Sequence, residues 1–174
     1  MDTLHSITIR EGLLNDAENM LRIQREIIEE KEFLLSDPEE FNKTVDDQKQ
    51  WIQHILQNSR EIILVAEVDG EMVGWLVFQS PNRVRLNHTG SFGMMVLKEY
   101  RNMKIGRILL EALLTWAECH EEIEKVCLGV LSSNERAIHL YRSLGFIEEG
   151  HKVNEVKIDN RYVDDILMYK NIKK

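Results

Sequence analysis

The segment that decides the fold is Val96-Leu97-Lys98-Glu99-Tyr100-Arg101-Asn102-Met103-Lys104-Ile105-Gly106-Arg107. Residues 91–97 are apolar enough to predict a strand, and residues 104–119 carry apolar side chains at the spacing of one helix face. Residues 98–107, the turn and the start of the helix, contain four basic residues and a single acid, Glu99. The first turn of a helix presents unpaired N–H groups and a positive dipole end, which bind phosphate, and Gly106 would let a ligand approach the backbone. The segment therefore predicts a diphosphate site, with a solvated basic turn as the alternative.

The rest of the chain alternates strand and helix patterns on both sides of this segment. The expected strands are 6–10, 62–68, 72–78, 91–97, 126–131, 146–156 and 161–170, and the expected helices are 14–30, 43–57, 104–119 and one that begins near 133. Because strands and helices are interspersed, we expect a single α/β or α+β domain over residues 1–174.

Three local signals fix turns within this order. Asp69-Gly70 separates two β-rich runs and predicts a hairpin. Ser132 and Glu135 have the spacing of a capping box, which predicts the start of the last helix. Gly145 is placed to end that helix.

Composition limits the possible partners and compartments. The 174 residues are 43% hydrophobic and 30% charged, with a net charge of −8, which disfavours a nucleic-acid partner. No apolar run reaches about 18 residues and the first residues do not resemble a signal peptide, so we expect no membrane partner and a cytoplasmic location. The two cysteines lack CxxC spacing and the six histidines are scattered, so no metal site is expected.

The central segment resembles the coenzyme A-binding motif of the GNAT superfamily of acetyltransferases, Arg/Gln-x-x-Gly-x-Gly/Ala. Arg101 and Gly106 match its ends, whereas Lys104 stands where the motif has its middle glycine. Residues 134–146 are similar to the second signature of the superfamily, Asn-x-x-Ala-x-x-Leu-Tyr-x-x-x-Gly-Phe, at every named position. The resemblance covers residues 60–170 well and the first 60 residues by element order alone.

This resemblance implies a fold and a coenzyme site. The implied fold is a mixed, mostly antiparallel seven-stranded sheet with about four helices, in which the fourth and fifth strands splay apart. Acetyl-coenzyme A (acetyl-CoA) would be the co-substrate, with its pantetheine arm in the gap beside Met95, Val96 and Leu97. The other implied coenzyme-binding residues are Asn134 and the residues of the turn: Arg101, Asn102, Met103, Lys104, Ile105, Gly106 and Arg107.

The resemblance also implies direct attack of a neutral amine on the thioester in a ternary complex. Tyr141 is the candidate acid for the departing thiolate, because its phenol is neutral at pH 7; a packed helix tyrosine is the alternative. His88 is a candidate base, although a lone loop histidine is more often structural. Glu29, Glu30 and Glu32 are candidates to hold a cationic amine, or they form a solvated helix end.

Several alternatives stay open. The acceptor is a protein N-terminus or lysine, a polyamine or another small amine, and the exposed late strands would allow a homodimer. Lys104 favours a degenerate module that binds acetyl-CoA without turnover. A nucleotide-binding domain is disfavoured because Gly-x-Gly-x-x-Gly is absent. Asn134 also has a purely structural alternative as the first residue of a helix.

Overall fold

A computed structural model describes residues 5–173, which contain seven strands, four α-helices and three short 3₁₀ helices. The strands are β1 (Ile7–Glu11), β2 (Ile62–Val68), β3 (Glu71–Gln79), β4 (Thr89–Val96), β5 (Lys125–Leu131), β6 (Ile147–Ile158) and β7 (Arg161–Asn171). The α-helices are α1 (Ala17–Glu29), α2 (Val45–Leu56), α3 (Ile105–Cys119) and α4 (Glu135–Ser143). The 3₁₀ helices are η1 (Leu14–Asp16), η2 (Val84–Leu86) and η3 (Lys98–Met103).

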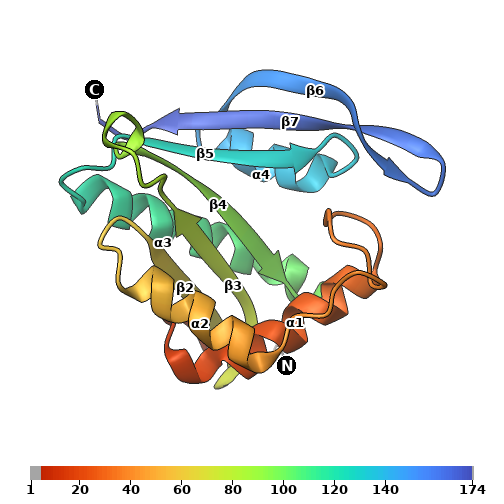
Figure 1. Cartoon of the computed structure of the whole chain (residues 1–174), viewed down its shortest axis with the longest axis horizontal. Helices are drawn as coiled ribbons and strands as arrows, with labels where there is room; N and C mark the ends of the chain where they lie inside the picture. Colours follow the sequence, from red (N-terminus) through yellow and green to blue (C-terminus); the bar gives the residue numbers. More distant parts are fainter. Residues whose placement is uncertain (1–4, 174) are drawn as a thin grey trace.

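All seven strands belong to one sheet in the order β1-β2-β3-β4-β5-β7-β6 (Figure 1). Every neighbouring pair is antiparallel except β4 and β5, which run parallel. The expected mixed, mostly antiparallel sheet with four helices is therefore confirmed. Among residues 5–173, no helix is both long and apolar enough to cross a membrane.

The sheet opens between β4 and β5. The two strands pair only at Thr89–Lys125, Gly90–Val126 and Ser91–Cys127. Beyond these pairs β4 stays paired with β3 as far as Val96, and β5 stays paired with β7 as far as Leu131. The backbones of residues 92–96 and 128–131 therefore bound a gap, which we call the β4–β5 gap, with its closed end at Ser91 and its open end at Val96. The expected splaying is confirmed.

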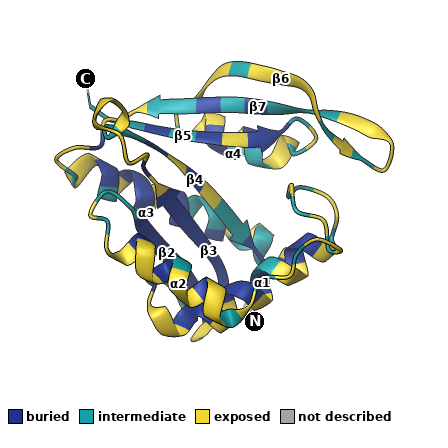
Figure 2. Cartoon of the chain, in the orientation of Figure 1, coloured by how far each residue is buried: buried dark blue, intermediate teal, exposed yellow. Residues whose placement is uncertain are grey.

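The helices cover the two faces of the sheet in pairs. Alternate residues of β2 divide between two apolar clusters, with Ile62 and Leu64 facing α3 and α4, and Ile63 and Val65 facing α1 and α2. Burial on both faces explains why β2 and β3 are nearly continuous apolar runs rather than alternating ones. Figure 2 shows this buried centre, whereas β6 is largely exposed and β7 is mostly of intermediate burial.

The predicted start of the last helix is wrong in detail. Ser132 does not cap α4, because its hydroxyl accepts a hydrogen bond from the Asp164 N–H (3.2 Å) and so ties the end of β5 to β7. The N-cap is Asn134, whose side chain accepts from the Ala137 N–H at 3.2 Å. Gly145 follows the helix at φ +88°, as its predicted role in ending α4 requires.

A partly buried ion pair fixes the entry of the chain into α1. Both terminal nitrogens of Arg10 donate to the carboxylate of Asp16, each at 2.8 Å, and the Leu13 N–H donates to the same carboxylate at 2.7 Å. Burial pushes the pKa of Asp16 upward, but the hydrogen bonds from Arg10 and Leu13 outweigh it and bring the pKa below its ordinary value. This stabilisation is present above the ordinary pKa and is lost as acid takes the pH through the lower folded-state pKa.

We predict that Arg10→Met lowers the free energy of unfolding by about 2 kcal/mol, because Asp16 keeps a buried charge without its partner. Arg142→Met is the matched control, since Arg142 is 61% exposed and its pair with Glu148 should contribute less than about 0.5 kcal/mol. Urea unfolding of both variants gives the comparison. Equal losses would show that the Arg10–Asp16 pair is no stronger than a surface pair.

Candidate active site

The start of α3 lies at the open end of the β4–β5 gap and has no side-chain cap. Its N-cap residue, Lys104, makes no side-chain hydrogen bond to the helix, whereas Thr44 caps α2 and Asn134 caps α4. The first helical bond runs from the Ile108 N–H to the Lys104 carbonyl at 3.0 Å. The N–H groups of residues 105–107 therefore have no acceptor within the helix and are available to an anion.

Lys104 occupies a backbone conformation that favours glycine. Its φ is +62° and its ψ is +13°, in the left-handed region. This conformation explains why a glycine is the usual residue at this position of the motif, because a side chain there costs about 1 kcal/mol. The turn forms nevertheless, and the exposed side chain of Lys104 adds a positive charge beside the free N–H groups.

The position of Gly106 is closely packed on one side. A Cβ atom at this position would lie 3.3 Å from the Cε of Met94 and 3.6 Å from the Cδ2 of Leu140. The bare face of Gly106 is therefore turned toward β4 and α4. We conclude that Gly106 allows α3 to pack closely against these two elements, and the approach of a ligand to its backbone stays a prediction.

Arg101 and Glu30 bind each other. The two terminal nitrogens of Arg101 donate to the two carboxylate oxygens of Glu30 at 2.8 and 2.7 Å, and its Nε donates to the Val96 carbonyl at 2.9 Å. Both side chains are largely buried, at 19% and 13% exposed. Arg101 thus attaches η3 to the end of α1, and neither side chain is free for the diphosphate or the amine expected from the sequence.

A second arginine supports the turn and was not recognised in the sequence. Arg136, in the first turn of α4, donates to the carbonyl of Arg101. Arg107 also reaches α4, where it donates to the Ser143 hydroxyl at 2.6 Å. Arg136 falls on an unspecified position of the second signature, so only the charge of its side chain could have drawn attention to it. The cations around the turn are Lys98, Arg101, Lys104, Arg107 and Arg136.

The strand register decides which groups of β4 face the gap. The Leu97 N–H donates to the Val73 carbonyl at 2.9 Å, so the backbone of Leu97 points toward β3. Antiparallel pairing repeats every second residue, so Met95 also points toward β3, and its carbonyl lies 2.7 Å from a Cβ built on Gly74. Met94 presents its N–H and its carbonyl to the gap, whereas Val96 presents its N–H, because its carbonyl accepts from Arg101. The predicted contact with pantetheine therefore moves to Met94.

Tyr141 lies on the face of the sheet that α3 and α4 cover. Its ring makes edge-on contacts with Phe92 of β4 and with Phe146, at centroid distances of 5.7 and 6.1 Å. Burial raises the pKa of Tyr141 to about 12. Because Phe92 is one residue beyond the last pair of β4 and β5, the tyrosine lies beside the beginning of the gap.

His88 and two of the glutamates are not brought to this turn. His88 precedes β4 at the closed end, where its carbonyl accepts from the Glu124 N–H at 2.8 Å. Eight residues at about 3.3 Å each place it roughly 26 Å from Val96 along the strand. Glu29 and Glu32 are exposed at the end of α1 and in the following loop, and a role in binding the acceptor stays a prediction for them.

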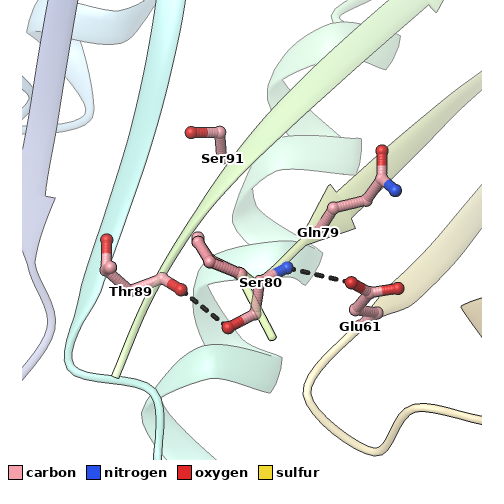
Figure 3. Close-up of a pocket in the computed structure, with 7 residues that line it drawn as sticks. Glu61, Gln79, Ser80, Thr89 and Ser91 are labelled. Atoms are coloured by element: carbon pink, nitrogen blue, oxygen red, sulfur yellow. Dashed lines mark hydrogen bonds between the residues drawn. The ribbon is translucent and has the colours of Figure 1, made fainter. Parts of the chain in front are cut away.

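A hollow of about 400 Å³ lies at the closed end of the gap, away from the turn before α3 (Figure 3). Glu61, Ser80 and Thr89 line it, and two hydrogen bonds connect them: the Ser80 N–H donates to Glu61 at 3.2 Å, and its hydroxyl donates to the Thr89 carbonyl at 2.8 Å. Burial raises the pKa of Glu61. The hollow is remote from the turn before α3, so we do not assign the coenzyme to it.

We predict that Lys104→Gly raises the free energy of unfolding relative to Lys104→Ala by about 1 kcal/mol, because both variants lose the charge but only glycine relieves the left-handed backbone. Thermal and urea unfolding of the pair measure the difference. A Lys104→Ala variant as stable as Lys104→Gly would contradict the left-handed conformation of this residue.

Comparisons with known proteins agree with this geometry. Residues 22–146 match the model of the acetyltransferase (GNAT) family. An N-alpha-acetyltransferase of Sulfurisphaera tokodaii is 31% identical over 167 residues, which is 90% of this chain and 86% of that protein. A spermidine N(1)-acetyltransferase of Vibrio cholerae is 28% identical over 117 residues, 67% of this chain and 66% of that protein.

Solved structures give the same result for the fold. A GNAT-family acetyltransferase of Streptococcus pneumoniae superposes with a TM-score of 0.90 at 26% identity, over 95% of this chain and 99% of that one. A phosphinothricin acetyltransferase of Sinorhizobium meliloti, in complex with acetyl-CoA, has a TM-score of 0.85 at 20% identity, over 96% of this chain and 89% of that one. The strands β4 and β5 part, α3 begins without a side-chain cap, and the family model matches most of the length of the chain. The chain therefore belongs to the GNAT family of acetyltransferases.

Proposed function

We propose that the protein transfers an acetyl group from acetyl-CoA to a primary amine, by direct attack of the amine in a ternary complex. The observation that carries this proposal is the uncapped start of α3 at the open end of the β4–β5 gap. There the free N–H groups of residues 105–107 and the side chain of Lys104 suit a diphosphate. The backbone groups of Met94 and the N–H of Val96 suit an extended, amide-containing arm in the gap.

The coenzyme supplies an activated acetyl group, and the chain supplies orientation and a proton. Tyr141 is suited to protonate the departing sulfur. With its pKa raised to about 12, its phenol stays protonated over the whole physiological range. Such an acid contributes about 10²- to 10⁴-fold to a rate. Asn134 uses its carbonyl oxygen to cap α4, which leaves its amide N–H₂ as the group able to contact the arm.

The acceptor class is proposed only as a primary amine. The relatives that match this chain are named for three different acceptors: spermidine, an α-amine and L-amino acids. These acceptors share an amine that is cationic at pH 7, and a chain of net charge −8 is compatible with all of them. A cytoplasmic location, and a homodimer formed through the exposed β6 edge, are retained as proposals.

A degenerate, non-catalytic module is not favoured by the geometry. Lys104 was the feature that suggested it, and the turn accommodates this lysine in the conformation that the motif glycine would adopt. The aromatic surroundings of Tyr141 are also intact, with Phe92 and Phe146 both in edge contact.

We predict that Tyr141→Phe lowers kcat by about 10²-fold and leaves the Kd for acetyl-CoA unchanged, because the ring contacts remain and only the hydroxyl is lost. Turnover is measured with spermidine and with a tripeptide that has a free α-amine, and acetyl-CoA binding is measured by calorimetry. Undiminished turnover would remove Tyr141 as the acid. Failure of the wild type to bind acetyl-CoA would overturn the proposed function itself.

A further inference from the structure

A carboxylate that the sequence patterns did not single out lies over β5 beside the β4–β5 gap. Asp165 of β7 is opposite Leu131 in the pairing of β5 with β7, and its side chain leans toward Gly129. A Cβ atom built on Gly129 would be only 2.9 Å from the Asp165 Oδ1. The absence of a side chain at position 129 is therefore what allows this carboxylate to lie against β5.

The carboxylate has few partners of its own. Its nearest cation is the Nζ of Lys152, which is 3.7 Å from Oδ2, and Lys152 is itself half exposed and is shared with Glu155 at 3.8 Å. Within residues 5–173, no hydrogen bond reaches the Asp165 carboxylate. The side chain is 17% exposed, so it keeps access to the surface while most of it is withdrawn from water.

The Asp165 carboxylate and Tyr141 lie on opposite faces of the sheet, beside residues at neighbouring levels of the gap. Pairing of Ser91 with Cys127 places Cys127 and Gly129 on the face that α1 and α2 occupy, whereas Phe92 and Tyr141 are on the face of α3 and α4. Gly129 is two residues beyond the last β4–β5 pair and Phe92 is one residue beyond it. Gly129 and Phe92 therefore differ in level along the gap by about 3.3 Å.

The Asp165 face is open at this level. Gly93 of β4 and Gly129 of β5 are both exposed, and a Cβ atom on Gly93 would meet nothing within 4 Å. The helices α1 and α2 pack on β2, β3 and the end of β4 and leave these two glycines uncovered. An acceptor arriving from this side would meet a carboxylate at the point where the strands separate.

From this arrangement we propose that Asp165 binds the ammonium group of the acceptor and takes its proton as the amine attacks the thioester. This inference rests on the proposed acetyl transfer. The charge-assisted hydrogen bond from the ammonium replaces the weak contact with Lys152. The acceptor enters from the Asp165 face, and the thiolate departs beside Tyr141 on the other face.

The proton and electron balance of the step is complete. The ammonium gives one proton to Asp165, and the neutral nitrogen forms a C–N bond with the thioester carbon. The tetrahedral intermediate collapses with cleavage of the C–S bond, and the thiolate takes a proton from the Tyr141 hydroxyl. The nitrogen then loses a second proton, which returns to the Tyr141 oxygen. Asp165 releases its own proton to solvent, so one proton is released in each turnover.

The test compares Asp165→Asn with Glu155→Gln, which removes the other carboxylate from Lys152 without touching the gap. We expect Asp165→Asn to lower kcat/KM for spermidine at pH 7 by about 10²-fold, with the Kd for acetyl-CoA and the unfolding midpoint close to wild type. The deficit should shrink as the pH rises toward the acceptor pKa, because more acceptor is then already neutral. Glu155→Gln should retain full turnover.

A second variant keeps the Asp165 carboxylate but displaces it. Gly129→Ala introduces the Cβ that lies 2.9 Å from Asp165, so it should also reduce turnover while acetyl-CoA binding persists. Turnover of Asp165→Asn within twofold of wild type, or an equal loss in Glu155→Gln, would overturn the role of Asp165 and leave the proposed function standing. A wild type that binds acetyl-CoA but acetylates no amine would overturn the proposed function, and this role with it.

Discussion

The parting of β4 from β5 after three residue pairs is the constraint on which the rest of the structure depends. Each strand satisfies one side of its backbone through its other neighbour, β3 or β7, and so remains extended without the partner it has lost. The separation leaves backbone groups of β4 unpaired within a sheet, which is costly unless water or a ligand pairs with them. An extended ligand with its own amide groups would meet that requirement, and α3 begins where such a ligand would emerge.

Side chains around the opening act mainly to hold its walls in place. The Arg101 guanidinium donates hydrogen bonds to Glu30 and to the Val96 carbonyl, and Arg136 of α4 donates to the carbonyl of Arg101. The turn before α3 is thus attached to α1 on one side and to α4 on the other. The consequence for experiments is that replacing Arg101 removes a structural ion pair as well as a charge, so a loss of binding in that variant would not identify a phosphate contact. Lys104, whose side chain is exposed, is the cleaner position.

The sequence predicted the fold well because its signals are local. The Asp69-Gly70 hairpin, the glycine after α4 and the apolar runs of β2 and β3 each specify their own conformation. The site was predicted less completely, because its geometry depends on register and on contacts between distant residues. Nothing local distinguishes Met94 from Met95 as the residue that faces the gap, since this follows from pairing with β3. The pairing of Arg101 with Glu30, 71 residues apart, has no local signal either, and the approach of Asp165 to Gly129 requires the alignment of β7 with β5.

The central claim is that the uncapped start of α3 and the free side of β4 hold the coenzyme. The most direct measurement is an amide NMR titration of the protein with coenzyme A, which lacks the acetyl group and so reports binding without turnover. The largest shifts should fall on the N–H groups of residues 105–107 and on Met94 and Val96, with little change at Glu61 and Ser80 near the closed end. Shifts confined to the closed end, or none at residues 105–107, would contradict the assignment.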